Sequence, residues 1–377
     1  MSQLGGAGGA GGAGGAGGAG GAGGAGGAGG AGGAGGAGGA MLGTMADAFA
    51  NPIMVDALIL GREGTMVVPD TNYYAPGLPA IDDTTQMDRW EPWVRAYTAL
   101  GEMLQGISFQ ASGNGFQVLS SGSLLAEIGR PLEATFQAQI PLVLSWAELR
   151  HERATEIMAQ IDPTYAFWSS IVYMHPDRTK RTFELVNIVL QFCVYVEMRF
   201  KHALACWRPV EYNAQVQPMI TTPGHGSFPS GHATQVYAVA HVLKKLLMLS
   251  ATNAGHLMIN DQLDRQAARI ATNRVVAGVH FPIDSMAGRM LGVALAEYFV
   301  GRCTSGQTLA GRKFIAGPGG IDGRPNTEFN PFSGEQESLD GGRFYSSTSG
   351  PGIVKSPLME YMWGKAQAEW SGRFGVP

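Results

Sequence analysis

The spacing of hydrophobic positions predicts a series of helices in the second half of the chain. Between residues 179 and 207, apolar side chains recur every three or four positions and would form one buried helix face: Leu185, Val189, Phe192, Val196 and Phe200. A similar apolar spacing runs through residues 230–249. Two more helices are expected over residues 262–276 and 282–299, and Pro282 suits the first position of the latter.

The hydrophobic pattern before this region is also helical, with frequent breaks. Helices are expected over residues 90–106 and 132–160, and Pro141 should divide or kink the second of these. Gly and Ser clusters interrupt the pattern at 112–115 and 120–123. We find no convincing run of alternating polar and apolar residues. The predicted fold class is therefore mainly α, a helical bundle with irregular arms.

Composition divides the chain into four parts. Residues 1–40 contain twelve copies of Gly-Gly-Ala, and no buried core would repay the backbone entropy of ordering them, so a disordered tail is expected rather than a packed polyglycine sheet. Residues 41–89, with four prolines and little periodicity, are expected to be an irregular arm that wraps the core. Residues 90–302 form the predicted helical domain. Residues 303–377 begin with a long stretch rich in Gly, Ser, Asn and Pro, and are predicted to be a loop-rich extension.

Charge, cysteine content and hydropathy argue against several classes of protein. A formal net charge of −4 gives no basic footprint for nucleic acid. Three cysteines without metal-type spacing indicate reduced thiols. The most apolar stretch, residues 185–200, includes Asn187, Glu197 and Arg199, so no membrane span is expected. The first forty residues show no secretory signal pattern, and the compartment is not indicated.

Three blocks of polar and charged residues lie between residues 201 and 284. In the first block, Lys201 and Arg208 are seven residues apart, about two helical turns, so both can point from one helix face. Lys201 supplies a compact ammonium charge and Arg208 a planar guanidinium, and both groups commonly hold a phosphate-like anion. The second block, Pro229-Ser230-Gly231-His232, stands at the start of an expected helix. Free N–H groups at such a start attract anions, and glycine allows close approach.

The third block supplies another cation and a second imidazole. Arg274 is followed by His280 and then by Asp284. With His232, two imidazoles are available as acid, base, nucleophile or metal ligand. Asp284 is spaced to hold one nitrogen of His280, so that the other nitrogen faces the anion.

Each block also has a purely structural interpretation. Lys201 and Arg208 suit the C-terminal dipole of a helix, Ser230 suits an N-cap, and Asp284 suits the first turn of the next helix. Each of these readings is reasonable for one block alone. Three blocks in order, with every charged position filled, favour an anion-binding active site.

The ordered pattern Lys-x6-Arg-Pro, Pro-Ser-Gly-His and Arg-x5-His-x3-Asp resembles the signature shared by vanadium-dependent haloperoxidases and type 2 phosphatidic-acid phosphatases, the PAP2 superfamily. The window covers 84 of the 377 residues. Asn273 precedes Arg274 where the family usually has Ser, and we expect only a tuning effect from that change. The resemblance implies a helical bundle of the vanadium haloperoxidase/PAP2 type, with residues 90–302 as its catalytic domain.

In the haloperoxidase branch, the resemblance implies vanadate as the cofactor. His280 would bind vanadium through Nε2, and His232 would be the acid–base group. The oxygens of vanadate would be held by residues of all three blocks: Lys201, Arg208, Ser230, Gly231 and Arg274. Hydrogen peroxide would then oxidise a halide to a hypohalous-acid equivalent, which halogenates a small organic substrate.

The same residues suit a second enzyme, a PAP2-type acid phosphatase acting on phosphate monoesters. His280 would attack phosphorus to form a phosphohistidine, His232 would protonate the leaving alcohol, and Asp284 would steady His280. Chain length without a membrane span, and the helical pattern before the first block, favour the haloperoxidase. A binding protein that keeps the anion pocket without turnover is a third class, with no positive support in the residues.

His225 bears on the choice of halide. Bromide-preferring haloperoxidases have a second histidine at the position that corresponds to His225, seven residues before His232. A site residue that favours bromide over chloride and an exposed loop histidine are equally compatible with the sequence. Relatives are often dimers or larger, which by analogy suggests a homo-oligomer.

Overall fold

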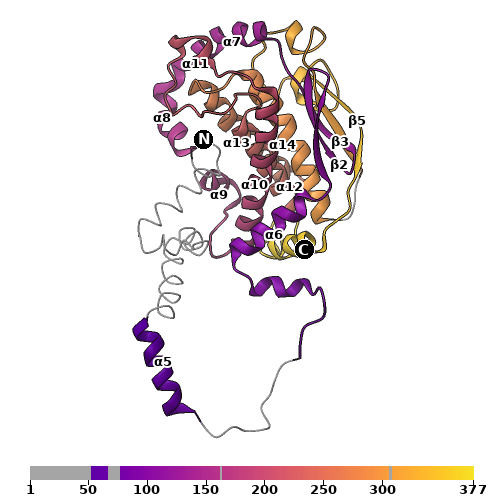
Figure 1. Ribbon diagram of the computed structural model, residues 1–377. Coiled ribbons are helices and arrows are strands. Elements are labelled where there is room, and N and C mark those ends of the chain that lie inside the picture. The colour runs from indigo at the N-terminus through magenta and orange to yellow at the C-terminus, as the bar shows by residue number, and fades with distance from the viewer. Residues whose placement is uncertain (1–51, 67–76, 162–163, 305–307) are drawn as a thin grey trace. The chain divides into compact units, whose positions relative to one another are not determined.

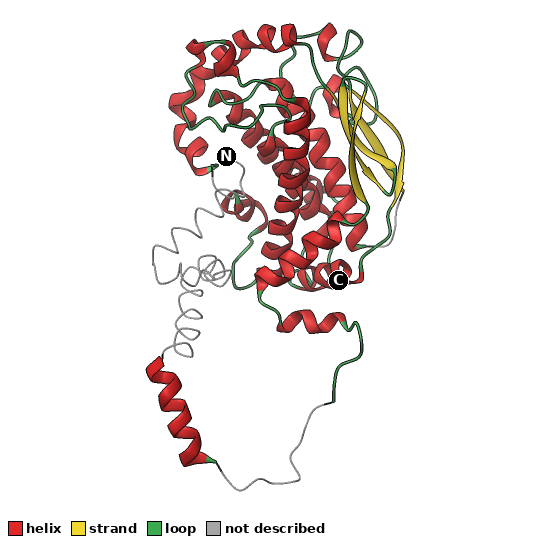
Figure 2. Cartoon of the chain, viewed as in Figure 1, coloured by secondary structure: helices red, strands yellow, loops and turns green. Residues whose placement is uncertain are grey.

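The computed structural model describes residues 52–66, 77–161, 164–304 and 308–377 (Figures 1 and 2). The chain divides into two compact units, with the boundary between Arg95 and Ala96. The predicted disordered tail, residues 1–40, lies outside the described residues. No helix in the described part of the chain combines the length and apolarity that a bilayer crossing requires.

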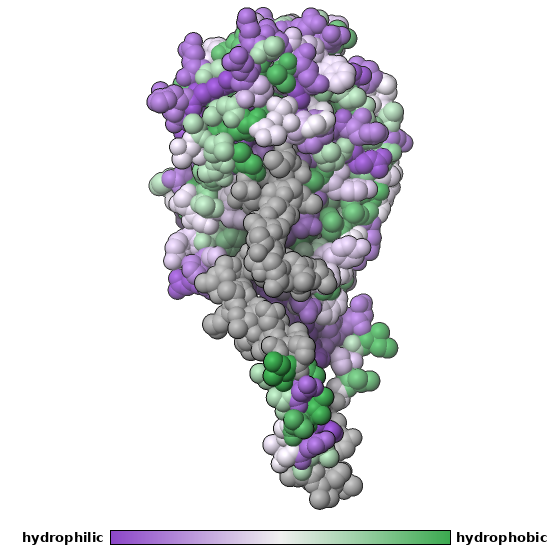
Figure 3. Space-filling view, turned by 60° about the vertical axis from the view of Figure 1, so that its left-hand side comes forward, coloured by the Kyte–Doolittle hydropathy of each residue, from purple (hydrophilic) through white to green (hydrophobic). Residues whose placement is uncertain are grey.

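The described part of the first unit contains more helix than the sequence suggested. The expected irregular arm includes the helix α5 (Pro52–Thr65) and the 3₁₀-helix η1 (Thr84–Arg89). Asp83 caps η1, because its side chain accepts a hydrogen bond from the Thr85 amide at 2.9 Å. The α5 helix exposes many apolar side chains, visible as green atoms in Figure 3.

The second unit is built on three long helices whose periodic apolar faces are buried. They are α10 (Lys180–Leu204), α12 (Gly231–Leu246) and α14 (Pro282–Cys303), and α12 packs against both of the others. Helix α6 (Pro92–Leu104) crosses the boundary between the two units. The remaining helices of the second unit are α7 (Glu133–Trp146), α8 (Arg150–Ala159), α9 (Tyr165–Val172), α11 (Pro209–Tyr212), α13 (Ala254–Val276), α15 (Gly334–Glu337) and α16 (Pro357–Ala368), with short 3₁₀ turns η2 (Ala147–Leu149), η3 (Ala214–Val216) and η4 (Ile321–Gly323).

Close approach of α12 and α14 depends on two glycines. A Cβ built on Gly288 would lie 2.6 Å from the carbonyl oxygen of Ser230, and one built on Gly292 would overlap the carbonyl of Thr234. Neither backbone can move without separating the helices, so both glycines fit the packing.

Gly292→Ala is expected to destabilise the protein by about 1–3 kcal/mol, because the added methyl meets backbone rather than a mobile side chain. Thermal unfolding of the variant measures this. Gly364→Ala, in α16 with open space around the glycine, is the matched control and should be neutral or stabilising by up to about 1 kcal/mol. Equal melting temperatures for Gly292→Ala and the parent protein would contradict the packing argument.

A five-stranded sheet lies beside the helices, on the side of α14 (Figures 1 and 2). Its strands follow the chain order: β1 (Ile107–Ser112), β2 (Gly115–Ser120), β3 (Ser123–Gly129), β4 (Thr308–Phe314) and β5 (Tyr345–Gly352). All neighbours are antiparallel except β3 and β4, which pair in parallel with Ala126 opposite Arg312. The C-terminal extension therefore completes a sheet that the residues before α7 begin.

The C-terminal residues also hold the start of α10. The Glu369 carboxylate accepts hydrogen bonds from the backbone amides of Arg181 and Thr182, at 2.7 and 2.9 Å, and from the Thr182 hydroxyl at 2.9 Å. These amides belong to the first turn of α10, which has no acidic residue of its own there. An acceptor from the end of the chain thus caps the helix that carries the first block.

The expected helical character is confirmed, and the sheet is the principal feature that the sequence prediction missed. The two Gly/Ser breaks are the hairpin turns between β1 and β2 and between β2 and β3. Pro141 lies inside α7, and the expected helical region over 132–160 is two helices, α7 and α8, joined by η2. Helix α13 begins earlier than expected, at Ala254, where the Asn253 side chain caps it.

Candidate active site

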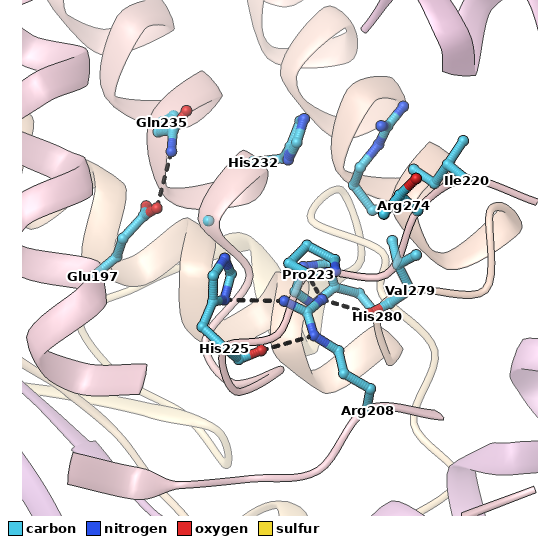
Figure 4. A pocket seen from close by; sticks show the side chains of 12 residues that line it. Glu197, Arg208, Ile220, Pro223, His225, His232, Gln235, Arg274, Val279 and His280 are labelled. Atoms are coloured by element: carbon cyan, nitrogen blue, oxygen red, sulfur yellow. Dashed lines mark hydrogen bonds between the residues drawn. The ribbon is translucent and has the colours of Figure 1, made fainter. Parts of the chain in front are cut away.

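A pocket at the meeting point of α10, α12, α13 and the start of α14 contains residues from all three blocks (Figure 4). It encloses about 380 Å³ of space not filled by protein atoms, its open mouth included. This volume includes open solvent at the mouth, so the enclosed space is small and a compact ligand fits best. The lining residues are Glu197, Arg208, Ile220, Thr221, Pro223, His225, Gly231, His232, Gln235, Arg274, Val279 and His280.

Arg208 reaches the pocket by a different route from the one expected. Helix α10 ends at Leu204, and Arg208 follows in an extended conformation because Pro209 starts α11. The two cations of the first block therefore do not share a helix face. The Arg208 guanidinium donates to the Val279 carbonyl at 2.7 Å and contacts Nδ1 of His225 and Nε2 of His280.

The contacts of His280 select one tautomer. Arg208 Nη1 lies 3.1 Å from His280 Nε2, and a guanidinium can only donate, so Nε2 carries the lone pair. Nδ1 carries the proton and donates it to Oδ2 of Asp284 at 2.8 Å. Burial, followed by the charge of Arg208, holds the pKa of His280 well below its usual range. His280 is thus a neutral imidazole with its Nε2 lone pair at the pocket.

Asp284 is a fully buried hub with three donors on one oxygen. Oδ2 accepts from His280 Nδ1, from the Phe281 amide at 3.0 Å and from the Ser227 hydroxyl. Burial raises the pKa of Asp284, and the Ser227 and Phe281 hydrogen bonds oppose that shift. Asp284 therefore does both things expected of it, since it holds His280 and caps the first turn of α14. Ser227 was not foreseen as part of this site.

Arg274 is buried at the pocket wall with part of its guanidinium unsatisfied. Nη2 donates to the Ile157 carbonyl at 3.1 Å and to Oε1 of Gln160 at 3.0 Å. Nε and Nη1 have no hydrogen-bond partner among the described residues. Burial lowers the pKa of Arg274 to about 10, which still leaves it charged at neutral pH. Two unpaired donors on a buried cation are costly unless a ligand accepts from them.

Gln160, directly after α8, positions residues of both the second and the third block. Its side-chain oxygen accepts from Arg274 and from Nδ2 of Asn273 at 3.0 Å. Its backbone carbonyl lies 3.0 Å from Nε2 of His232. A carbonyl only accepts, so Nε2 of His232 carries the proton and Nδ1 the lone pair. Burial and then the charge of Arg274 hold the pKa of His232 well below its usual value.

Gln160→Leu is expected to weaken the binding of a tetrahedral oxyanion about 10- to 100-fold. Leucine keeps the volume and the backbone acceptor but removes the oxygen that orients Arg274. Titration calorimetry with tungstate, a stable tetrahedral dianion, measures the change. Gln137→Leu, on an exposed face of α7, is the matched control and should bind as the parent protein does. Parent-like binding by Gln160→Leu would show that Arg274 needs no such support.

Lys201 lies beside the pocket rather than in its wall. Its ammonium group donates to the carbonyls of Gly226, Ser227 and Pro229, at 3.2, 3.0 and 2.5 Å. Burial lowers the pKa of Lys201, but only the charged amine can donate three hydrogen bonds, so we assign it as a cation. Lys201 therefore shapes the loop before α12 and adds positive potential behind the pocket, with all three of its donors engaged.

The second block divides between structural and pocket roles. The Ser230 hydroxyl is the N-cap of α12, accepting from the Ala233 amide, and the Ser230 amide donates to the Asp284 carbonyl at 2.9 Å. The cap interpretation of Ser230 is the one that the structure supports. Gly231, the first residue of α12, lines the pocket. A Cβ there would lie 2.6 Å from Oε1 of Glu197, so glycine allows that carboxyl to approach.

His225 belongs to the pocket and is only partly exposed. Arg208 Nη2 lies 3.2 Å from its Nδ1, and Nδ1 also lies 3.2 Å from the Gly226 carbonyl oxygen. Arg208 can only donate, which favours a lone pair on Nδ1, whereas the Gly226 carbonyl can only accept, which favours a proton there, so the two contacts do not select one tautomer. Nε2 is buried without a partner among the described residues. Burial, with the charges of Lys201 and Arg208, lowers the pKa of His225 to about 4, so the ring is neutral.

Glu197 and Gln235 were not predicted to belong to the site, and only a tuning effect was expected from Asn273. Asn273 is buried and links Gln160 to Arg153, whose Nη1 donates to Asn273 Oδ1 at 2.9 Å. That fits a supporting role for the position where the family usually has Ser. Glu197 and Gln235 line the pocket. Glu197 lies one helical turn before Lys201 on α10, and Gln235 lies one turn after His232 on α12. Each therefore faces the same side of its helix as a residue of the blocks, and this spacing was the available signal in the sequence.

Comparison with known families agrees with this geometry. Residues 183–301 match the family model of the PAP2 superfamily. The matched segment runs from α10 into α14 and contains all three blocks. It confirms the resemblance at the level of the superfamily, to which both haloperoxidase-like and phosphatase-like proteins belong. A search of curated proteins found no match.

Proposed function

We propose that the protein is a vanadate-dependent haloperoxidase that oxidises halide, with bromide preferred to chloride, using hydrogen peroxide. The observation that carries the proposal is the Arg274 guanidinium, which is buried at the pocket wall and whose Nε and Nη1 have no hydrogen-bond partner in the described part of the chain. A protein gains nothing in stability from such a group. It gains a preorganised site for an anion with several oxygens.

The pocket residues fit a tetrahedral oxyanion such as vanadate. Arg208 and Arg274 supply two charges within the lining, and Lys201 adds a third from behind the loop. Gly231 brings the first turn of α12 to the pocket, where free amides and the helix dipole favour an anion. The oxygens would be held by Arg208, Arg274 and the Gly231 region.

His280 would be the single protein ligand of vanadium. Its Nε2 lone pair already lines the pocket, and Asp284 fixes the tautomer that keeps it there. On binding, Arg208 would exchange its contact with Nε2 for one with an oxygen of the anion. Bound vanadate supplies the Lewis-acidic centre at which hydrogen peroxide becomes an oxidant for halide.

His232 would transfer protons, and His225 would contact the halide. His232 is neutral with Nδ1 as its unprotonated nitrogen, so it can accept a proton from hydrogen peroxide at Nδ1. Nε2 of His225 is buried in the same pocket without a hydrogen-bond partner among the described residues. In the proposal, a bromide ion is held beside this ring by the Arg208 cation. The small organic substrate would receive the oxidised halogen.

The choice of haloperoxidase over the PAP2-type acid phosphatase rests on His225 and on chain organisation. His225 lines the pocket instead of lying exposed on a loop. Four helices, α6 to α9, also precede the first block, with strands β1, β2 and β3 between α6 and α7. In the phosphatase the same His280 lone pair would attack phosphorus and His232 would protonate the leaving alcohol.

Two assays on one preparation test the proposal. The purified protein is incubated with vanadate, and bromination of phenol red is followed with bromide and hydrogen peroxide. Hydrolysis of p-nitrophenyl phosphate is measured without vanadate. Bromination above the rate of free vanadate, inhibited by phosphate, is the expected result. Vanadate-inhibited hydrolysis without bromination would assign the phosphatase instead, and tungstate binding with neither activity would indicate a binding protein.

A further inference from the structure

The pocket contains an acidic group for which the oxyanion site has no evident use. Glu197, on α10, is 1% exposed and lines the pocket. Its Oε2 is buried without a hydrogen-bond partner among the described residues. An ionised carboxylate at this place would repel the anion that Arg208 and Arg274 are arranged to hold. The protonation state of Glu197 therefore matters to anything that binds.

Two neighbours fix the position of the Glu197 carboxyl. Gln235 Nε2, on α12, donates to Oε1 at 2.9 Å, and Figure 4 shows this pair at one side of the pocket. Gly231 leaves room for the carboxyl, because a Cβ there would lie 2.6 Å from Oε1. With Oε1 occupied as an acceptor, Oε2 is the oxygen left to meet a ligand.

Glu197 is not one half of a buried ion pair. Lys201, one helical turn further along α10, directs its ammonium group to three loop carbonyls. The hydrogen bond from Gln235 is the contact that the structure gives to the Glu197 carboxyl, within the described part of the chain. An uncompensated charge at a site this deeply buried is unfavourable, so burial favours the neutral acid over the carboxylate when the pocket is empty.

We propose that Glu197 works as a carboxylic acid, donating a hydrogen bond from Oε2 to the bound oxyanion, and that its ionisation expels the anion. This rests on the proposed oxyanion site and adds to it a proton-linked control of binding. The proton balance is simple. An anion that enters while Glu197 is ionised must bring the uptake of one proton to Oε2, and no other bond forms or breaks.

The charges around Glu197 do not reverse the upward shift of its pKa. Burial is the main cause that raises the pKa of Glu197, and the charge of Lys201 and the Gln235 hydrogen bond oppose it. The other titratable and charged groups that face this part of the pocket are Cys193 on the same helix, His232 on α12, Arg208 and His225 before it, and Arg274 and His280 across it. A bound anion offsets the cations among them and so raises the Glu197 pKa further.

The affinity for the anion is expected to fall as pH rises. The anion binds the protonated form, so affinity is complete below the pKa of Glu197 in the empty protein and falls as pH rises through it. The limiting slope is about tenfold for each pH unit. Tungstate is a suitable probe, because its own charge stays constant from about pH 6 to about pH 9, unlike that of phosphate or vanadate.

The decisive comparison is tungstate affinity of the parent protein and of Glu197→Gln, measured by calorimetry across that pH range. Glutamine keeps a donor at the position of Oε2 and cannot ionise. We expect the ratio of the two dissociation constants, parent over variant, to rise at least about tenfold from pH 6 to pH 9. A constant ratio would overturn the role of Glu197, while absence of tungstate binding by the parent at every pH would overturn the oxyanion site itself.

A second measurement keeps the test valid if Glu197→Gln folds poorly. Gln235→Leu removes the donor that lowers the pKa of Glu197, so the fall in tungstate affinity should move to higher pH. Calorimetry of the parent protein in buffers of different ionisation enthalpy should also show proton uptake on binding at about pH 8. An unshifted profile in Gln235→Leu, or binding without proton uptake, would contradict the proposal.

Discussion

Arg274→Met is expected to weaken oxyanion binding strongly and, at the same time, to stabilise the empty protein. Methionine fills much of the same buried volume but carries neither charge nor donors. Loss of the cation should weaken tungstate binding by about 2–5 kcal/mol, which is about 30- to 5,000-fold. Removal of a buried charge, two of whose nitrogens have no hydrogen-bond partner among the described residues, should raise stability by about 1–3 kcal/mol.

Weaker tungstate binding together with higher stability of the empty protein distinguishes a ligand-binding arginine from a structural one. Calorimetry gives the affinity, and thermal unfolding with and without tungstate gives the stability. Arg269→Met is the matched control. Arg269 lies on the same helix as Arg274, α13, and its Nη2 pairs at the surface with Oε2 of Glu156, on α8, at 2.7 Å. It should leave affinity unchanged and alter stability by less than about 1 kcal/mol. A destabilised Arg274→Met that binds tungstate as tightly as the parent protein would refute the assignment.

His280→Ala is expected to lower activity on the order of 1,000-fold or more. The variant loses the Nε2 lone pair, which serves as the vanadium ligand in the proposed reaction and as the nucleophile in the phosphatase alternative. Steady-state bromination and phosphoester hydrolysis both measure the effect. Tungstate affinity should fall less than turnover does, because the cations remain.

Two controls accompany this variant. His202→Ala removes an exposed histidine adjacent to Lys201 and should keep full activity. Circular dichroism should show that His280→Ala retains its helices, since the ring is held by side chains and not by the backbone ladder. Undiminished turnover in His280→Ala would remove this residue from the chemistry.

Helical periodicity predicted the elements that carry the site. Helices α10, α12 and α14 lie where their apolar spacing placed them, and four side chains of the three blocks line one pocket: Arg208, His232, Arg274 and His280. The charges and spacing of these residues were sufficient, because each lies at or next to the end of a well-defined helix. Lys201 shows the limit of that reasoning, since a residue pattern does not reveal that its donors turn to loop carbonyls.

The sheet and the supporting residues were not predictable in the same way. Strand β1 does alternate, with Ile107, Phe109 and Ala111 between polar residues, but it is only six residues long. Strand β5 lies in a Gly- and Ser-rich segment with no strong strand signal. The parallel pairing of β3 with β4 joins segments far apart in the chain. Gln160 escapes notice because a single glutamine after a helix has many structural roles.

The pairing of β4 and β5 with β3, and the cap that Glu369 places on α10, set an order for biosynthesis. A nascent chain that has left the ribosome only as far as α14 lacks the partner of β3 and the acceptor for the first amides of α10. Its hairpins present an open strand edge, a known route to intermolecular association. We therefore expect the helix bearing Glu197 and Lys201 to gain this cap, and the pocket to finish folding, only after the segment that carries Glu369 has been translated.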